Sequence, residues 1–112
     1  MFCFKKDTTL VSVNENIQRR LLSYGGGMMA YEFHIPKATT EPFMHSHPHE
    51  QIAYVIKGKL KFIIEENGVQ EAHILEPGDS VYFKPNLRHG FVVMEDNSMA
   101  LDTFTPQRED FL

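Results

Sequence analysis

Residues His45 to Gln51 read HSHPHEQ, and this stretch decides the interpretation of the whole chain. On an extended strand, alternate side chains lie on one face roughly 6.5–7 Å apart, so His45 and His47 can bind one ion. Gln51 has the same parity, and His89, in the later stretch FKPNLRHG, is a fourth candidate ligand. Imidazole nitrogens suit transition metals and an amide oxygen adds a harder donor, so the pattern predicts a metal site with neutral ligands.

His49 leaves the ligand set open, because it shares the parity of the other two histidines. Pro48 cannot donate to a β-ladder and often marks a bulge, so the register can slip at this point. Periodicity therefore does not exclude His49 as a ligand. The alternative interpretation of the stretch is an incidental cluster of solvated histidines.

Short segments rich in β-branched and aromatic residues run through the chain and predict an all-β fold, a sandwich or a barrel. We expect strands at residues 17–24, 28–35, 51–56, 59–66, 80–83 and 90–95, followed by a last strand that carries Asp102 and Phe104. Lys57-Gly58-Lys59 and Glu66-Asn67-Gly68 predict tight hairpins.

The composition is that of one small globular domain. The chain has 112 residues, a common size for a single domain. Its net charge of −4, without basic clusters, makes nucleic acid an unexpected partner. No apolar run approaches the length of a membrane span or a signal peptide, so we expect no membrane partner and a cytoplasmic location. Cys3 is the only cysteine, which excludes an internal disulfide.

The histidine stretch and the later segment resemble the paired motifs of the cupin superfamily. These are H-x-H, three or four residues, Glu or Gln, six residues and Gly, then PG-x(5)-P-x-G-x-x-H. The matching positions are His45, His47, Gln51, Gly58, Pro77, Gly78 and His89, whereas Thr39, Lys84 and Asn86 depart from the pattern. The resemblance implies a double-stranded β-helix, or jelly-roll barrel, that binds one divalent transition metal (Ni, Zn, Fe, Mn or Co). The implied ligands are His45, His47, Gln51 and His89, with His49 outside the set.

The same resemblance implies a domain organisation for residues 1–112. Residues 30–105 would form the cupin barrel, residues 1–29 would add N-terminal strands, and residues 106–112 would form a C-terminal tail. Small cupins commonly pair through their N-terminal strands. An unpaired apolar edge would be an aggregation hazard, so we expect a homodimer. The apolar N-terminal residues are Phe2, Phe4, Leu10, Val11 and Val13.

The C-terminal segment carries a second group of candidate site residues, called the second constellation; the four candidate metal ligands are the first. Asp102 and Phe104 share parity on the expected last strand, and Arg108 follows Pro106, where the chain must turn. An alternating strand could aim the first two into the barrel mouth, with the guanidinium of Arg108 reaching back over it. A buried carboxyl can transfer a hydroxyl proton, a guanidinium can hold a carboxylate, and an aromatic ring can pack on a sugar. The alternative is a surface tail with an ordinary salt bridge.

The two constellations together are similar to a family of small pectin-degradation cupins. This resemblance implies opening of 4,5-unsaturated uronates, released from pectin or alginate, into linear keto acids, with Asp102, Phe104 and Arg108 serving the active site. A small anionic sugar acid would then be the substrate. Two alternatives stay open from the sequence: a non-catalytic module that binds a sugar or another small molecule, and an iron-dependent cupin dioxygenase.

Overall fold

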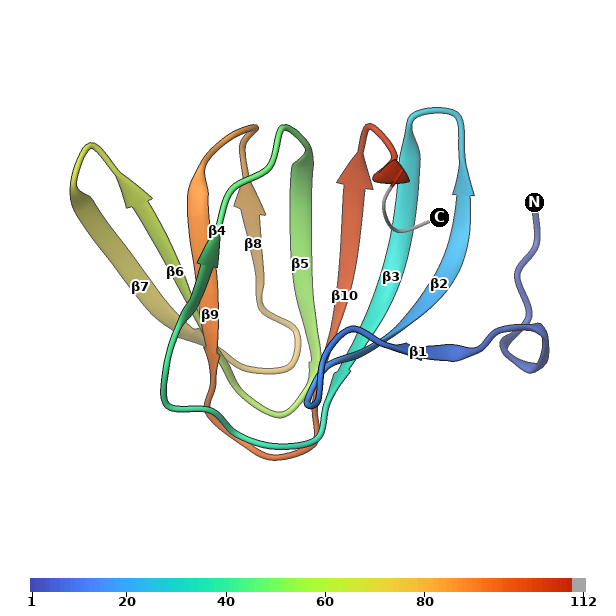
Figure 1. The fold of residues 1–112 in the computed structure, drawn as a ribbon, viewed down its shortest axis with the longest axis horizontal. Coiled ribbons are helices and arrows are strands. Elements are labelled where there is room, and N and C mark those ends of the chain that lie inside the picture. Colours follow the sequence, from blue (N-terminus) through green and yellow to red (C-terminus); the bar gives the residue numbers. More distant parts are fainter. Residues whose placement is uncertain (110–112) are drawn as a thin grey trace.

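The computed structural model describes residues 1–109 as two antiparallel β-sheets packed face to face (Figure 1). The larger sheet has the order β1-β2-β3-β10-β5-β8, and the smaller one has the order β4-β9-β6-β7. The elements are a 3-10 turn at Lys5–Asp7, β1 (Leu10–Ser12), β2 (Gln18–Gly25), β3 (Met28–Ile35), β4 (Phe43–His45), β5 (Glu50–Lys57), β6 (Leu60–Glu66), β7 (Val69–Leu75), β8 (Ser80–Phe83), β9 (Arg88–Val93) and β10 (Ser98–Thr105). The all-β prediction is confirmed.

The core lies between the two sheets and follows from strand alternation. Along β5, the side chains of Gln51, Ala53 and Val55 are buried, whereas the intervening Ile52 and Tyr54 are exposed. The same alternation on the other strands directs a set of apolar side chains inward. This set comprises Ile35, Ala53, Val55, Leu60, Phe62, Leu75, Phe83, Leu87, Val93 and Ala100. Burial of this set against the opposite sheet holds the sandwich together.

One of the two predicted hairpins is wrong. Asn67 and Gly68 both have positive φ, 55° and 77°, and join the paired strands β6 and β7 as expected. The chain around Gly58 instead passes from β5 in the larger sheet to β6 in the smaller one. Gly58 has φ of 82°, and a Cβ there would lie 2.2 Å from the Ser98 hydroxyl oxygen. Gly58 is therefore required by a close approach to β10.

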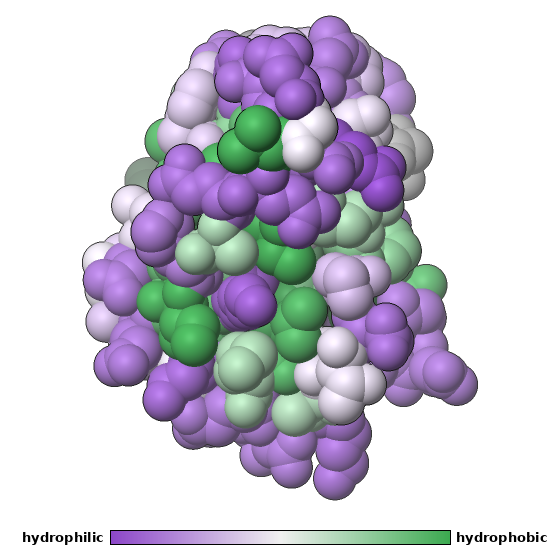
Figure 2. Space-filling model, turned by 90° about the vertical axis from the view of Figure 1, so that its left-hand side faces the viewer, coloured by the Kyte–Doolittle hydropathy of each residue, from purple (hydrophilic) through white to green (hydrophobic). Residues whose placement is uncertain are grey.

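The face of the molecule that carries β7 shows hydrophobic groups interrupted by hydrophilic side chains (Figure 2). β7 is an edge strand of the smaller sheet, and six of its seven residues are exposed. His73 Nε2 lies 2.8 Å from a carboxylate oxygen of Glu71 on this edge, and a carboxylate on an edge strand opposes pairing with another chain. Within residues 1–109, no helix has the length and apolar character needed to cross a membrane.

The topology brings the two candidate constellations to the same end of the sandwich. The β4–β5 loop and the segment after β10 lie at one end of the strands, and the β1–β2 loop lies at the other (Figure 1). β10 pairs with β5, with Phe104 opposite Gln51 and Asp102 opposite Ala53. Residues 110–112 of the predicted tail lie outside the described residues.

Gly90 lets β4 pack closely against β9, and its replacement by alanine should destabilise the fold. A Cβ on Gly90 would lie 2.0 Å from the carbonyl oxygen of Phe43 and 2.6 Å from the sulfur of Met44. β4 would have to move, so we expect a loss of about 1–3 kcal/mol in the free energy of unfolding. Chemical denaturation measures this loss. A Cβ on Gly27 meets nothing within 4 Å, so Gly27→Ala is the control, and equal stability of the two variants would contradict the assignment.

Candidate metal centre

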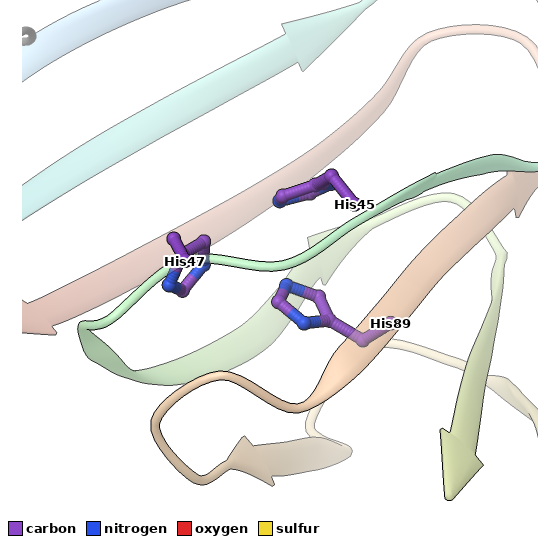
Figure 3. A group of neighbouring side chains, drawn as sticks. All are labelled: His45, His47 and His89. Atoms are coloured by element: carbon purple, nitrogen blue, oxygen red, sulfur yellow. The ribbon is translucent and has the colours of Figure 1, made fainter.

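Three histidines from three segments converge at one end of the sandwich (Figure 3). His45 ends β4 and lies opposite His89 on the neighbouring strand β9, while His47 lies in the β4–β5 loop. Their candidate ligand atoms all lie within 4.8 Å of one another. The ring centroids of His45 and His89 are 4.5 Å apart, and those of His47 and His89 are 4.9 Å apart. This geometry places three imidazoles around one point.

The local structure that brings His45 and His47 together differs from the predicted one. HSHPHEQ is not one extended strand, because β4 ends at His45 and β5 begins only at Glu50. Pro48 lies in the loop that carries the chain from the smaller sheet to the larger one, and the amide of Asn86 donates to the carbonyl of His47 at 2.7 Å. His45 and His47 meet through a turn between sheets, so alternation on one strand is not the cause.

Backbone carbonyls orient two of the imidazole rings. His47 Nδ1 lies 3.0 Å from the carbonyl oxygen of His49, and His89 Nδ1 lies 2.8 Å from that of Leu87. Since a carbonyl only accepts, each Nδ1 carries the proton and each Nε2 keeps its lone pair. Phe83 stacks on His89 with ring centroids 4.1 Å apart, which further restricts that ring. This is the outer-shell arrangement that metal-binding histidines use.

Gln51 connects His47 to Asp102. Its side-chain nitrogen donates to Asp102 Oδ2 at 2.9 Å, which turns the amide oxygen toward His47 Nε2, also at 2.9 Å. With the His47 proton on Nδ1, these two facing atoms are both acceptors. A cation that binds both His47 Nε2 and the Gln51 amide oxygen would remove the repulsion between these two acceptors. Neighbouring ligands of an octahedral ion are about 3 Å apart when each metal–ligand bond is about 2.1 Å, which matches their separation. The arrangement fits a divalent ion.

Other donor atoms support the same fit. His45 Nδ1 and His89 Nε2 are buried and lack a hydrogen-bond partner. Burial is the main cause that lowers the pKa of His45 to about 4, and the neighbouring His89 and His47 add to it. Burial also lowers the pKa of His47 and of His89. The three rings are therefore neutral at pH 7 and able to donate lone pairs to a metal.

His49 lies beside the centre and outside the group of converging ligands. Among residues 1–109, the histidines, cysteines and carboxylates that could share one ion are His45, His47 and His89. His49 contributes its backbone carbonyl to His47, and its ring centroid is 5.6 Å from that of His47. The main-chain carbonyl of His49 thus orients His47, while the Nδ1 atom of its ring is buried without a hydrogen-bond partner.

Asp102 presents a buried carboxyl group on β10 next to the histidines. Its Oδ2 accepts the hydrogen bond from Gln51, while Oδ1 is buried without a partner. Burial raises the pKa of Asp102 to about 7, against the opposing effects of the Gln51 hydrogen bond and of Arg108. A carboxyl group that titrates near neutrality can both accept and return a proton.

Phe104 and Arg108 lie against the same group of side chains. The Arg108 guanidinium carbon is 5.3 Å from the centre of the Phe104 ring, and this ring contacts His47 edge-on at 5.7 Å. Phe104 is only 2% exposed. Its ring contacts Arg108 and His47 and also lines the internal cavity, and its packing on a sugar stays a prediction.

A cavity of about 390 Å³ opens beside the histidines and lies between the two sheets. At one end it is lined by polar groups: His45, Ser46, Gln51, His89, Asp102 and Arg108. The remainder is lined largely by apolar side chains, including Phe33, Ile35, Leu60, Phe62, Phe91 and Ala100. Its volume suits a small molecule, and its convergent polar groups mark it as the candidate binding site.

Comparison with known proteins gives this arrangement a family. The Cupin domain family matches residues 31–104, which contain all four proposed ligands. The chain belongs to the cupin family. This cupin is 35% identical over 107 residues to the pectin degradation protein KdgF of Dickeya dadantii (strain 3937), covering 95% of this chain and 93% of that protein.

Solved cupin structures share the fold over nearly the whole chain. KdgF from Halomonas sp. superposes with a TM-score of 0.88 at 29% identity, covering 100% of this chain and 98% of that one. An RmlC-like cupin from Shewanella frigidimarina superposes with a TM-score of 0.84 at 30% identity, covering 99% and 95%. Oxalate decarboxylase from Bacillus subtilis, at 20% identity, is similar in fold alone. The predicted membership of the KdgF-like cupins is confirmed.

The sequence motifs predicted the three histidines that the structure brings together, but gave no signal for the groups that orient them. The carbonyls of His49 and Leu87 carry no signal in side-chain spacing. The bridge from Gln51 to Asp102 depends on the pairing of β5 with β10, which joins residues 51 positions apart. Asn86, which departs from the cupin motif, has φ of 63° and so supplies the positive φ of the glycine common at that position.

Proposed function

We propose that this cupin opens 4,5-unsaturated uronates into linear keto acids, with one divalent transition metal held by His45, His47, Gln51 and His89. The observation that carries the proposal is the Gln51 amide, which joins the ligand cluster to the buried carboxyl group of Asp102. This link places a proton acceptor beside the position where a substrate hydroxyl would meet the metal. The names of the KdgF relatives support a role in pectin degradation.

The bound cation would supply Lewis acidity and lower the pKa of a hydroxyl group beside it. Asp102 accepts the proton of the hemiacetal hydroxyl through its unpartnered Oδ1. The hemiacetal carbon then forms a carbonyl, its bond to the ring oxygen breaks, and the electron pair stays on that oxygen as an enolate. Asp102 or water returns one proton to the double-bond carbon that does not carry this oxygen, and the C–O⁻ group becomes the ketone carbonyl, which gives the keto form. The substrate and the product are isomers, so no oxidant is needed.

Arg108 is the cation that would hold the substrate carboxylate at the polar end of the cavity. Its guanidinium lies over Phe104, which limits its motion and presents it toward the cavity. A planar guanidinium can hold a carboxylate through two parallel hydrogen bonds, so its loss should affect both binding and orientation. In this account Phe104 is a positioning residue for Arg108 and His47.

Replacing Arg108 with alanine should lower kcat/KM for unsaturated uronate at least about tenfold, because a charge-assisted contact contributes about 1.5–3 kcal/mol. Metal content should stay at the wild-type level. Arg108→Lys keeps the positive charge but lacks the planar guanidinium, so its kcat/KM should lie between those of the wild type and Arg108→Ala. Steady-state kinetics with elemental analysis measure both quantities, and wild-type kcat/KM in Arg108→Ala would remove the residue from the proposal.

We also propose that the protein is a homodimer that pairs through its N-terminal strands. β1 is an edge strand of the larger sheet, and the segment around it exposes large apolar side chains. Phe2 is 90% exposed, Phe4 59% and Val11 50%. Pairing with a second copy would cover this edge. Light scattering at micromolar concentration should give twice the chain mass of 13.0 kDa, whereas a monomeric mass would refute the dimer.

A further inference from the structure

The cavity offers much more apolar surface than a sugar acid needs. A uronate ring carries a carboxylate and several hydroxyl groups, and each of these needs a polar partner when buried. The polar side chains of the cavity are concentrated at the end near the metal centre. The aromatic and aliphatic part between the sheets, including Phe62, Phe91 and Leu60, would lie against any hydroxyl groups placed there. This part of the cavity suits a different kind of ligand.

The apolar part has a definite direction. It runs from the polar end toward the β1–β2 loop, where Val13, Asn14 and Ile17 line the cavity. This loop lies at the opposite end of the strands from the segment that carries Arg108 (Figure 1). Reciprocal hydrogen bonds fix the loop, because the side-chain amide of Asn16 donates to the Lys37 carbonyl at 2.9 Å and accepts from the Lys37 amide at 3.0 Å.

We propose that this cavity binds monocarboxylates with an unbranched apolar tail, the carboxylate on Arg108 and the tail between the sheets toward Val13. Charge sets the orientation, since Arg108 and the proposed metal centre both lie at the polar end of the cavity and Val13 marks an apolar end. The inference concerns binding and goes beyond the proposed ring opening.

The test is calorimetric titration of the metal-loaded protein with acetate, butanoate and hexanoate at fixed pH and ionic strength, without uronate. Each buried methylene contributes about 0.8 kcal/mol, so affinity should rise about fourfold per carbon. The heat-capacity change of binding should become more negative with tail length. Hexanol, which lacks the carboxylate, should bind at least about tenfold more weakly than hexanoate, because it cannot form the charge-assisted contact with Arg108.

A charge at the far end of the cavity should affect only the long ligand. Val13 is 44% exposed, so Val13→Glu is expected to fold, and it should weaken hexanoate binding at least about fivefold while acetate binding stays unchanged. Val69→Glu is the matched control, because Val69 is exposed on β7 and does not line this cavity. An affinity that does not depend on tail length, equal binding of hexanol, or equal behaviour of the two variants would overturn the inference. Loss of uronate turnover alone would leave it standing.

Discussion

The Asp102→Asn protein should turn over 4,5-unsaturated uronate at least about 10²-fold more slowly than the wild type, because a positioned acid–base group contributes about 10²–10⁴-fold. Asparagine has nearly the same shape as aspartate and can still accept the hydrogen bond from Gln51, so the ligand cluster should keep its geometry. What it lacks is the ability to accept a proton at Oδ1, the buried atom that has no partner in the structure. Pre-steady-state or steady-state kinetics on metal-loaded protein measure the effect.

Two controls separate this loss of chemistry from a loss of structure. Metal content of Asp102→Asn should equal that of the wild type, and its free energy of unfolding should not decrease, since a buried carboxyl group whose pKa is raised to about 7 is replaced by a neutral amide. Asp7→Asn, at an exposed position in the N-terminal 3-10 turn, should leave turnover unchanged. If Asp102→Asn retained more than a tenth of the wild-type rate, Asp102 could not be the proton acceptor.

Removal of a proposed ligand histidine should lower turnover about as much as Asp102→Asn does, because the protein would lose its metal. The purified protein should carry close to one divalent transition metal per chain, and chelation should remove it. His45→Ala, His47→Ala and His89→Ala each delete one of three imidazoles that meet within 4.8 Å, so each should lower metal affinity by at least about tenfold. Elemental analysis after dialysis measures the content, and turnover should fall with it.

His49→Ala provides the matched control for these variants. Its side chain is outside the converging group, and the carbonyl that orients His47 belongs to the backbone and survives the substitution. It should keep most of the wild-type metal. Undiminished metal in His45→Ala and His47→Ala, or loss of metal from His49→Ala as great as from His47→Ala, would contradict the ligand assignment.

Most of the strands could be predicted from sequence because each carries its own signal, whereas β1 and β4, with three residues each, were not predicted. Alternation in β3 and β5 and the Asn67-Gly68 turn are local features, and the structure agrees with them closely. The partners of each strand are not local. The predicted hairpin at Gly58 failed because a glycine with positive φ serves a tight turn and a close approach to another strand equally well.

In the candidate site, too, local sequence features could be predicted, whereas features that depend on contacts between distant segments could not. Residue types and motif spacing identified His45, His47 and His89, although the assumed extended strand was wrong. Strand parity predicted that Asp102 points into the interior, but its raised pKa could not be predicted, because it comes from burial between sheets whose contacts join distant segments. The apolar part of the cavity was missed for the same reason: phenylalanines that a sequence assigns to the core also line an internal space.

The proposed reaction can be followed by mixing metal-loaded protein with a 4,5-unsaturated uronate and recording the ultraviolet absorbance of its conjugated double bond. Ring opening and tautomerisation remove that double bond. We expect the absorbance to fall much faster than in buffer alone. Chelated protein should show only the spontaneous rate, and restoring the metal should restore the fast phase. A rate equal to the spontaneous one with fully metal-loaded wild-type protein would contradict the proposed reaction.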